Sequence, residues 1–166
     1  TKKYENGTIS YNQVKNLDSQ ASIKTISKNK DIEKISESVK KYSEEDHLPS
    51  QSKGARLYRI LKERISVISP DIFPSATKTY IKFQIPGNWR SIFTVFVKKD
   101  KVILEFLRSK PGDFEDPSRK LRYKKDSFKY FNQHISILDI KDTDDVDYAI
   151  LLIQQLYNKF QKEYTQ

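Results

Sequence analysis

The chain has 166 residues, which suits one domain or one domain with an appendage, and 12% of its residues are aromatic, which argues against disorder. Its formal charge of +9 favours polyanionic partners, such as nucleic acid or an anionic membrane surface, and it also fits plain solubility. The chain contains no cysteine, which excludes disulfides, thiol catalysis and zinc sites built from thiolates.

Residues 1–50 are expected to be a linker and a helix that end a missing upstream domain. The opening YENGTISYNQV predicts a hairpin with its turn at Asn6-Gly7, and the polar TISKNK predicts a linker. Residues 31–42 carry one narrow apolar stripe at helical spacing, formed by Ile32, Ile35, Val39 and Tyr42. Because the chain does not begin with Met, we expect it to be a fragment of a longer protein.

Residues 51–166 are predicted to form one α+β domain. Apolar residues recur at helical spacing in 55–69 and 142–164, and four aspartates near the start of the second stretch favour a helix N-terminus. Strands are predicted at 79–85, 91–97, 102–107 and 134–140; the middle two are apolar on both faces and form a central hairpin. The expected fold is an antiparallel sheet of about four strands with two or three helices packed on one face.

Several stretches, in this order and spacing, resemble a known prokaryotic family. They are YSEEDHL, LYRILKERI, TKTYIKF, the hairpin through Phe93, Phe96 and Leu104, Asp116-Pro117, and DDVDYAILLIQQLY. From about Tyr42 to Tyr164 the chain is similar to domain of unknown function 5655, some members of which carry the older label "predicted transport protein". The resemblance implies a small α+β module, usually at the C-terminus of a larger protein beside nuclease-like or restriction-associated domains. It supplies no catalytic residues, and the Gly-rich, Trp-containing turn common in the family is replaced here by KYFNQHIS.

The stretch from Lys110 to Tyr130 interleaves basic groups with Phe114, Tyr123, Phe128 and Tyr130. Phosphates attract Lys and Arg, and bases stack on aromatic faces, so this loop is a candidate nucleic-acid contact. The alternative is a solvated connector whose aromatic residues pack against the sheet edge. The predicted nucleic-acid-binding residues are Arg90, Lys98, Lys99, Lys101, Arg119, Lys120, Arg122, Lys124 and Lys125.

A catalytic interpretation comes from Asp139-Ile140-Lys141, which ends an apolar strand as the acid-x-Lys pair does in metal-dependent nucleases. With Asp116 or Asp126 as a second carboxylate and Gln154 on the following helix, it could hold Mg²⁺ and orient a water. The alternative is that these residues simply end a strand before a helix cap.

Three further residues are singled out by their type, and two of them have two interpretations. His47 follows three acids and could be a general base, or it could be a local group that anchors the linker. His134 precedes a strand and is expected to be structural. Trp89 could stack on a ligand or be a partly buried edge aromatic.

The predicted function is a non-catalytic C-terminal accessory domain of a larger nuclease-related or defence-related protein, which binds DNA or RNA or positions its upstream domain. No catalytic residue, metal or cofactor is expected. The cytoplasm is the expected location, because no apolar run is long enough to span a bilayer and no signal peptide is visible. Two alternatives stay open: a protein–protein interaction or dimerisation module, favoured by an exposed stripe on 31–42, and a metal-dependent nuclease. The oligomeric state does not follow from the sequence.

Overall fold

The computed structural model describes residues 2–3, 9–10, 41–86 and 90–164, and it divides the chain into two compact units, Thr1–Lys40 and Lys41–Gln166. In the first unit, strand β1 (Lys2–Lys3) pairs antiparallel with β2 (Ile9–Ser10), as the predicted hairpin requires. Its turn, the linker, and nearly all of the helix predicted at 31–42 lie outside the described residues.

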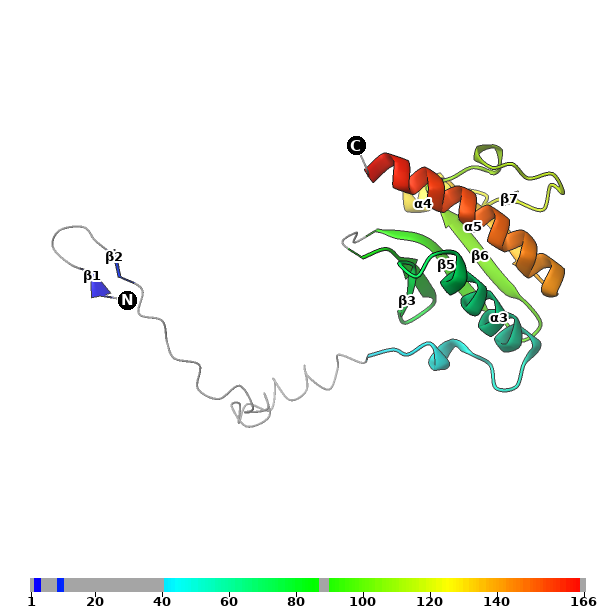
Figure 1. Cartoon of the computed structure of the whole chain (residues 1–166), viewed down its shortest axis with the longest axis horizontal. Coiled ribbons are helices and arrows are strands. Elements are labelled where there is room, and N and C mark those ends of the chain that lie inside the picture. The colour runs from blue at the N-terminus through cyan, green and yellow to red at the C-terminus, as the bar shows by residue number, and fades with distance from the viewer. Residues whose placement is uncertain (1, 4–8, 11–40, 87–89, 165–166) are drawn as a thin grey trace. The chain divides into compact units, whose positions relative to one another are not determined.

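The second unit contains a six-stranded antiparallel sheet with the strand order β3-β4-β5-β6-β8-β7 (Figure 1). The strands are β3 (Phe73–Ala76), β4 (Ile81–Gln84), β5 (Ser91–Val97), β6 (Val102–Leu107), β7 (Arg122–Tyr123) and β8 (Ile135–Ile140). The four predicted strands are all present, but the expected total of about four is too low, because two edge strands were missed. Strand β3 contains Pro74, a residue that argues against a strand but that a sheet tolerates at its edge. Strand β7 has only two residues, too few to show an alternation of apolar and polar side chains.

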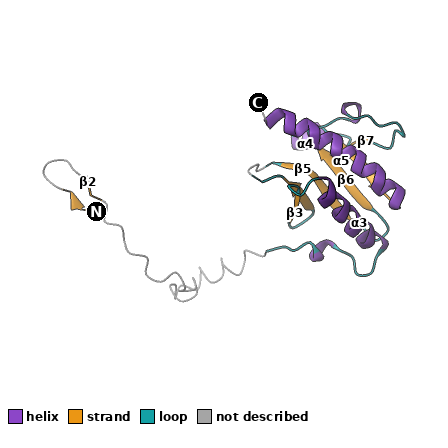
Figure 2. Ribbon diagram, in the orientation of Figure 1, coloured by secondary structure: helices purple, strands orange, loops and turns teal. Residues whose placement is uncertain are grey.

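Two long helices, α3 (Lys53–Ile68) and α5 (Thr143–Tyr164), lie side by side across one face of the sheet (Figure 2). The Ser52 hydroxyl begins α3 by accepting a hydrogen bond from the Ala55 amide at 3.0 Å. The α+β class and the helices at 55–69 and 142–164 are therefore confirmed. A short helix, α4 (Ser127–Phe131), and the 3₁₀ turns η1 (Glu45–His47) and η2 (Pro111–Asp113) complete the described elements.

The core lies between these helices and the sheet. Leu61 of α3, Leu152 of α5, and Leu104 and Leu138 of the central strands are fully buried there. Because successive side chains of a strand point to opposite faces, the residues that follow Leu104 and Leu138 point away from the helices. We call that second side of the sheet the open face.

The second unit begins before residue 51, where the domain boundary was predicted. Glu44 accepts hydrogen bonds from Tyr58 Oη at 2.5 Å and from Lys62 Nζ at 2.9 Å, both on α3. Burial, with the nearby Glu44 carboxylate, raises the pKa of Tyr58 well above its ordinary value, so it stays a donor. His47 Nε2 donates to the Thr77 carbonyl oxygen at 2.7 Å, since that oxygen can only accept. This contact fits the anchoring interpretation of His47.

Gly54 lets the start of α3 approach the turn between β5 and β6. Its amide donates to the Lys99 carbonyl at 3.1 Å. A Cβ at this position would fall on the Lys98 carbonyl oxygen and lie 2.8 Å from that of Lys101. A glycine inside a helix is otherwise unfavourable by about 1 kcal/mol relative to alanine, so close packing explains its presence.

Gly54→Ala is expected to lower the free energy of unfolding by about 1–3 kcal/mol, because the helix must move away from the hairpin. Urea unfolding measures this. The matched control is Gly112→Ala, where an added Cβ meets nothing within 4 Å and stability should change little. Equal effects of the two substitutions would contradict the close approach.

Candidate nucleic-acid interface

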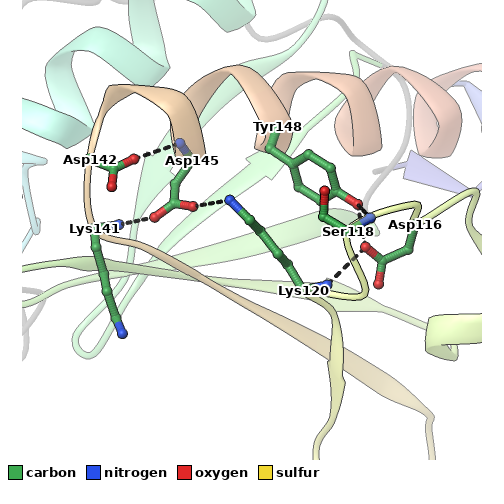
Figure 3. Close-up of polar contacts among 7 residues, drawn as sticks. All are labelled: Asp116, Ser118, Lys120, Lys141, Asp142, Asp145 and Tyr148. Carbon is green, nitrogen blue, oxygen red and sulfur yellow. Dashed lines mark hydrogen bonds and ion pairs between the residues drawn. The ribbon is translucent and has the colours of Figure 1, made fainter.

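The Lys110–Tyr130 loop is fastened to α5 through Asp116. Its carboxylate accepts hydrogen bonds from the hydroxyl of Tyr148, from the Lys120 amide at 3.0 Å and from the Leu121 amide at 2.9 Å (Figure 3). Tyr148 lies on α5, and its hydroxyl oxygen also accepts the Ser118 amide at 3.1 Å. The tip of the loop is therefore an ordered turn held by one carboxylate and one tyrosine.

A second contact joins the same loop to the first turn of α5. Lys120 Nζ lies 2.6 Å from Asp145 Oδ1, and the other oxygen of Asp145 accepts the Lys141 amide at 2.8 Å. Asp142 accepts the Asp145 amide at 2.9 Å and so caps the helix. Figure 3 shows Lys120 reaching toward Asp145 while the side chain of Lys141 points away. Lys120, predicted to bind phosphate, is thus engaged within the fold.

The electrostatics of this cluster favour charged Asp116, Asp145 and Lys120 and a neutral Tyr148 hydroxyl. Burial acts to raise the pKa of Asp116, but the hydrogen bonds from Tyr148 and the two loop amides outweigh it and lower that pKa. Asp145 behaves in the same way, with Lys120 as the principal lowering group. The pKa of Lys120 is raised by Asp145, and that of Tyr148 is raised by burial and then by Asp116.

Three more of the predicted cations form ion pairs on the open face. Arg122 and Lys101 both reach Asp139 Oδ2, at 3.0 and 3.1 Å. Lys124 Nζ lies 2.5 Å from Glu105 Oε1. Ion pairs offset the attraction of these cations for a polyanion, so the loop is a weaker phosphate contact than its composition indicates.

The other predicted cations do not gather in one patch. Within the described ranges, Lys98, Lys99, Arg119 and Lys125 are exposed and show no ion pair. Lys98 and Lys99 lie at one end of the β5–β6 hairpin and Arg90 lies beyond the other, roughly 25 Å away at 3.3 Å per residue of strand. The nine predicted residues therefore form separate groups.

One aromatic residue of the loop is partly buried, and the others are exposed. Phe114 packs on the core residue Phe106, with ring centres 5.2 Å apart, as the connector interpretation expects. Phe128, Tyr130 and Phe131 of α4 are 53%, 70% and 54% exposed, and Tyr123 is also exposed.

Cations accompany these exposed rings. Lys124 Nζ lies 5.0 Å from the ring centre of Phe131, and Lys129 Nζ lies 5.5 Å from that of Tyr130. We define the α4 surface as the exposed side chains of Tyr123, Lys125, Phe128, Lys129, Tyr130 and Phe131.

Two residues with positive φ flank α4. Asp126 (φ 59°) precedes the helix and Asn132 (φ 51°) ends it, and Asp and Asn tolerate this conformation better than most residues. The His134 ring stacks on Phe128 with centres 4.9 Å apart, and its Nδ1 lies 2.9 Å from Tyr123 Oη. These contacts fit the structural role expected for His134.

Sequence reasoning missed Lys129 and Phe131. The stretch SFKYF could have indicated them, because its aromatic residues flank a lysine and do not recur at the spacing of a buried helix face or strand face. A pocket of about 570 Å³ continues the α4 surface. It is lined by Phe131, Asn132 and Gln133 from the end of α4, by Arg90 and Ser91, and by Leu107 and Arg108.

The residues of the nuclease interpretation do not converge. Asp139 lies on the open face, whereas Gln154 is exposed on α5, on the other side of the sheet. Asp116 is occupied by Tyr148 and the loop amides, and Asp139 is paired with Lys101 and Arg122. Among the described residues, no three His, Asp or Glu side chains are placed to hold a metal ion.

Comparison with known proteins adds no relative. No protein-family model, curated protein or solved structure matches the chain. Within the part of the chain that the structure describes, no helix has both the length and the apolar character needed to cross a membrane. Trp89, a further candidate from the sequence, lies outside the described residues.

Tyr148→Phe removes the hydroxyl that joins Asp116 to α5. The loss of about 1 kcal/mol should make the Lys120 and Leu121 amides exchange with deuterium roughly fivefold faster. Tyr157→Phe on the same helix is the control, because the Tyr157 hydroxyl accepts a hydrogen bond from Gln161, on α5 itself, and not from the loop. Unchanged exchange in Tyr148→Phe would show that other contacts hold the loop.

The cluster also predicts how stability depends on pH. Asp116 and Asp145 have folded pKa values below the unfolded value of about 3.9, so their contribution is complete above that pH and is lost as pH falls through the folded pKa. Lys120 behaves oppositely: its contribution is complete below about pH 10.4 and is lost as pH rises through its raised pKa. Urea unfolding should show a smaller acid loss in Asp116→Asn than in the wild type, and parallel curves would contradict this.

Proposed function

We propose that the unit Lys41–Gln166 is a non-catalytic accessory module that binds single-stranded DNA or RNA through the α4 surface. The observation that carries the proposal is the exposure of Phe128, Tyr130 and Phe131 on a five-residue helix that also bears Lys129. Exposed rings of this kind cost free energy in water, and a stacked base would cover them.

Charge favours nucleic acid over a neutral partner. Residues 51–130 hold 19 Lys or Arg against 8 Asp or Glu. Lys125 and Lys129 lie at α4, and both are exposed. Such cations attract the phosphate backbone whatever the sequence of the strand.

A single strand fits this surface better than a duplex. The bases of a duplex stack on one another, so protein rings reach them only where the strand is unpaired. Because α4 has only five residues, it resembles a stacking platform more than a helix that reads bases in a groove.

A protein partner is the second candidate, since exposed aromatic residues are also enriched at protein interfaces. The apolar stripe at 31–42, which favoured that function in the sequence, lies outside the described residues. The similarity to domain of unknown function 5655 and the nuclease-like upstream neighbour stay predictions.

Fluorescence anisotropy of labelled single- and double-stranded DNA and RNA tests the proposal. We expect micromolar binding that is tighter for single strands and weakens steeply between about 50 and 200 mM salt. If none of these probes binds at low salt, the proposal is overturned. If the protein instead self-associates, a protein–protein interaction module is favoured.

Tyr130→Ala should weaken single-strand binding by about 1–3 kcal/mol, roughly five- to 150-fold, because a stacked base loses its platform. Val67→Ala is the control, since Val67 is an exposed apolar residue (82%) on α3. If both variants bind as the wild type does, the α4 surface is not the contact.

Lys125→Glu and Lys129→Glu should weaken binding and reduce its salt dependence, because each removes a phosphate contact. Lys78→Glu, an exposed lysine between β3 and β4, is the matched charge control. Arg122 and Lys124 are unsuitable for this test, since charge reversal there would leave two acids facing each other and would disturb the fold.

A further inference from the structure

The pocket at the end of α4 lies beside the exposed aromatic residues and is large enough for one base. Its volume is about 570 Å³, and its lining combines the end of α4 with the start of β5 and the end of β6. Pockets for small ligands usually have volumes of about 300–1,000 Å³, so a single nucleoside matches this one in size.

Two apolar side chains, Leu107 and Phe131, belong to the lining. Leu107 is on the open face, because it follows Phe106, which is fully buried beneath the helices. Lys124 places the Phe131 ring over the same face, since its Nζ lies 2.5 Å from Glu105 on β6 and 5.0 Å from the ring centre. A planar base in this pocket would cover apolar surface of both residues.

The end of α4 also supplies two side-chain amides that no other described residue uses. Asn132 and Gln133 line the pocket, and neither side-chain amide hydrogen-bonds within the described part of the chain. Gln155 on α5 differs, because its amide is engaged twice by the backbone of Glu115, at 2.8 and 3.1 Å. The backbone amide of Asn132 donates to the Phe128 carbonyl at 3.0 Å, which fixes the residue where the helix ends. The two side-chain amides are therefore held at the pocket and are available to a ligand.

A side-chain amide suits adenine better than guanine. It presents a donor and an acceptor side by side, and adenine offers the matching pair at N6 and N7, whereas guanine offers two acceptors, N7 and O6. Two acceptors suit the fork of an arginine, but Arg108 of the lining already donates to the Ser91 carbonyl at 2.6 Å. A purine is also larger than a pyrimidine, so it buries more apolar surface.

We propose that this pocket binds one unpaired adenine of a single strand, and that Asn132 and Gln133 select it. The inference rests on the proposed function, because the strand reaches the pocket from the α4 surface. Phe131 belongs to both places, so a strand passes directly from the stacking residues of α4 into the pocket. Base preference is thereby added to a contact that phosphate attraction and stacking alone would leave nearly indifferent to sequence.

Fluorescence anisotropy of the full chain with labelled DNA strands that differ in one base tests the inference. Each strand has about ten nucleotides, a length that suits a single-strand site, and consists of thymidine except for one central adenine, guanine or cytosine. An all-thymidine strand is the reference. We expect the strand with adenine to bind roughly five- to 150-fold more tightly than the reference, because one good bidentate contact discriminates bases to about that extent.

Two variants test whether the amides cause this preference. Gln133→Leu and Asn132→Gly each remove one amide, and each should reduce the ratio of the two affinities toward one. Glycine is chosen at position 132 because it readily adopts the φ of 51° found there. Gln154→Leu, which removes an exposed amide on α5, is the control and should keep the wild-type ratio. A residue with a merely structural role would change both affinities together and leave their ratio unaltered.

Backbone amide shifts of the ¹⁵N-labelled wild type locate the preference without any variant. The difference between the shifts caused by the adenine strand and by the all-thymidine strand should be largest at Leu107, Asn132 and Gln133. A difference that lies elsewhere in the described chain would contradict the pocket.

The affinities separate this inference from the proposed function. If the strands bind with equal affinity, or if both amide variants keep the preference for adenine, the base pocket is overturned and single-strand binding at α4 stands. If no strand binds, the proposed function is overturned and the base pocket with it.

Discussion

The structure depends on burying one face of the sheet under two helices. Leu61 of α3 and Leu152 of α5 meet Leu104 and Leu138 of the central strands, and all four are removed from water. Burial of apolar area supplies most of the favourable free energy of such a fold. One consequence is that every alternate residue of the central strands must lie on the open face, where Glu105 and Asp139 are found.

That constraint governs where charge is placed. Glu105 and Asp139 lie beside hydrophobic strand residues, and they attract Lys124, Lys101 and Arg122 as partners. Lys120 is drawn in the same way to the first turn of α5. The basic loop is therefore largely a structural connector. Among the described residues, Lys125 and Lys129 at α4 are exposed and form no ion pair, so they remain able to attract a polyanion.

The sequence predicted the long elements because their hydrophobic periods are strong. Leu57, Leu61 and Ile65 recur at helical spacing, and the 91–107 hairpin is apolar on both faces. It did not predict β7, with two residues, or α4, with five, because such segments are too short to show a period. It also did not predict that Arg122 meets Asp139, since ion pairs between distant residues depend on strand register and loop path. Composition alone therefore overstated how much of the loop's positive charge is left without an acidic partner in the fold.

We propose that this domain binds nucleic acid through α4 and not through the length of its basic loop. The most direct measurement is a map of backbone amide shifts when a short single-stranded DNA is added to the ¹⁵N-labelled chain. We expect amide shifts concentrated at residues 123–133 and near Arg108, with little change at Arg119 and Lys120. Shifts spread along 115–122, or confined to the β3 edge of the sheet, would contradict it.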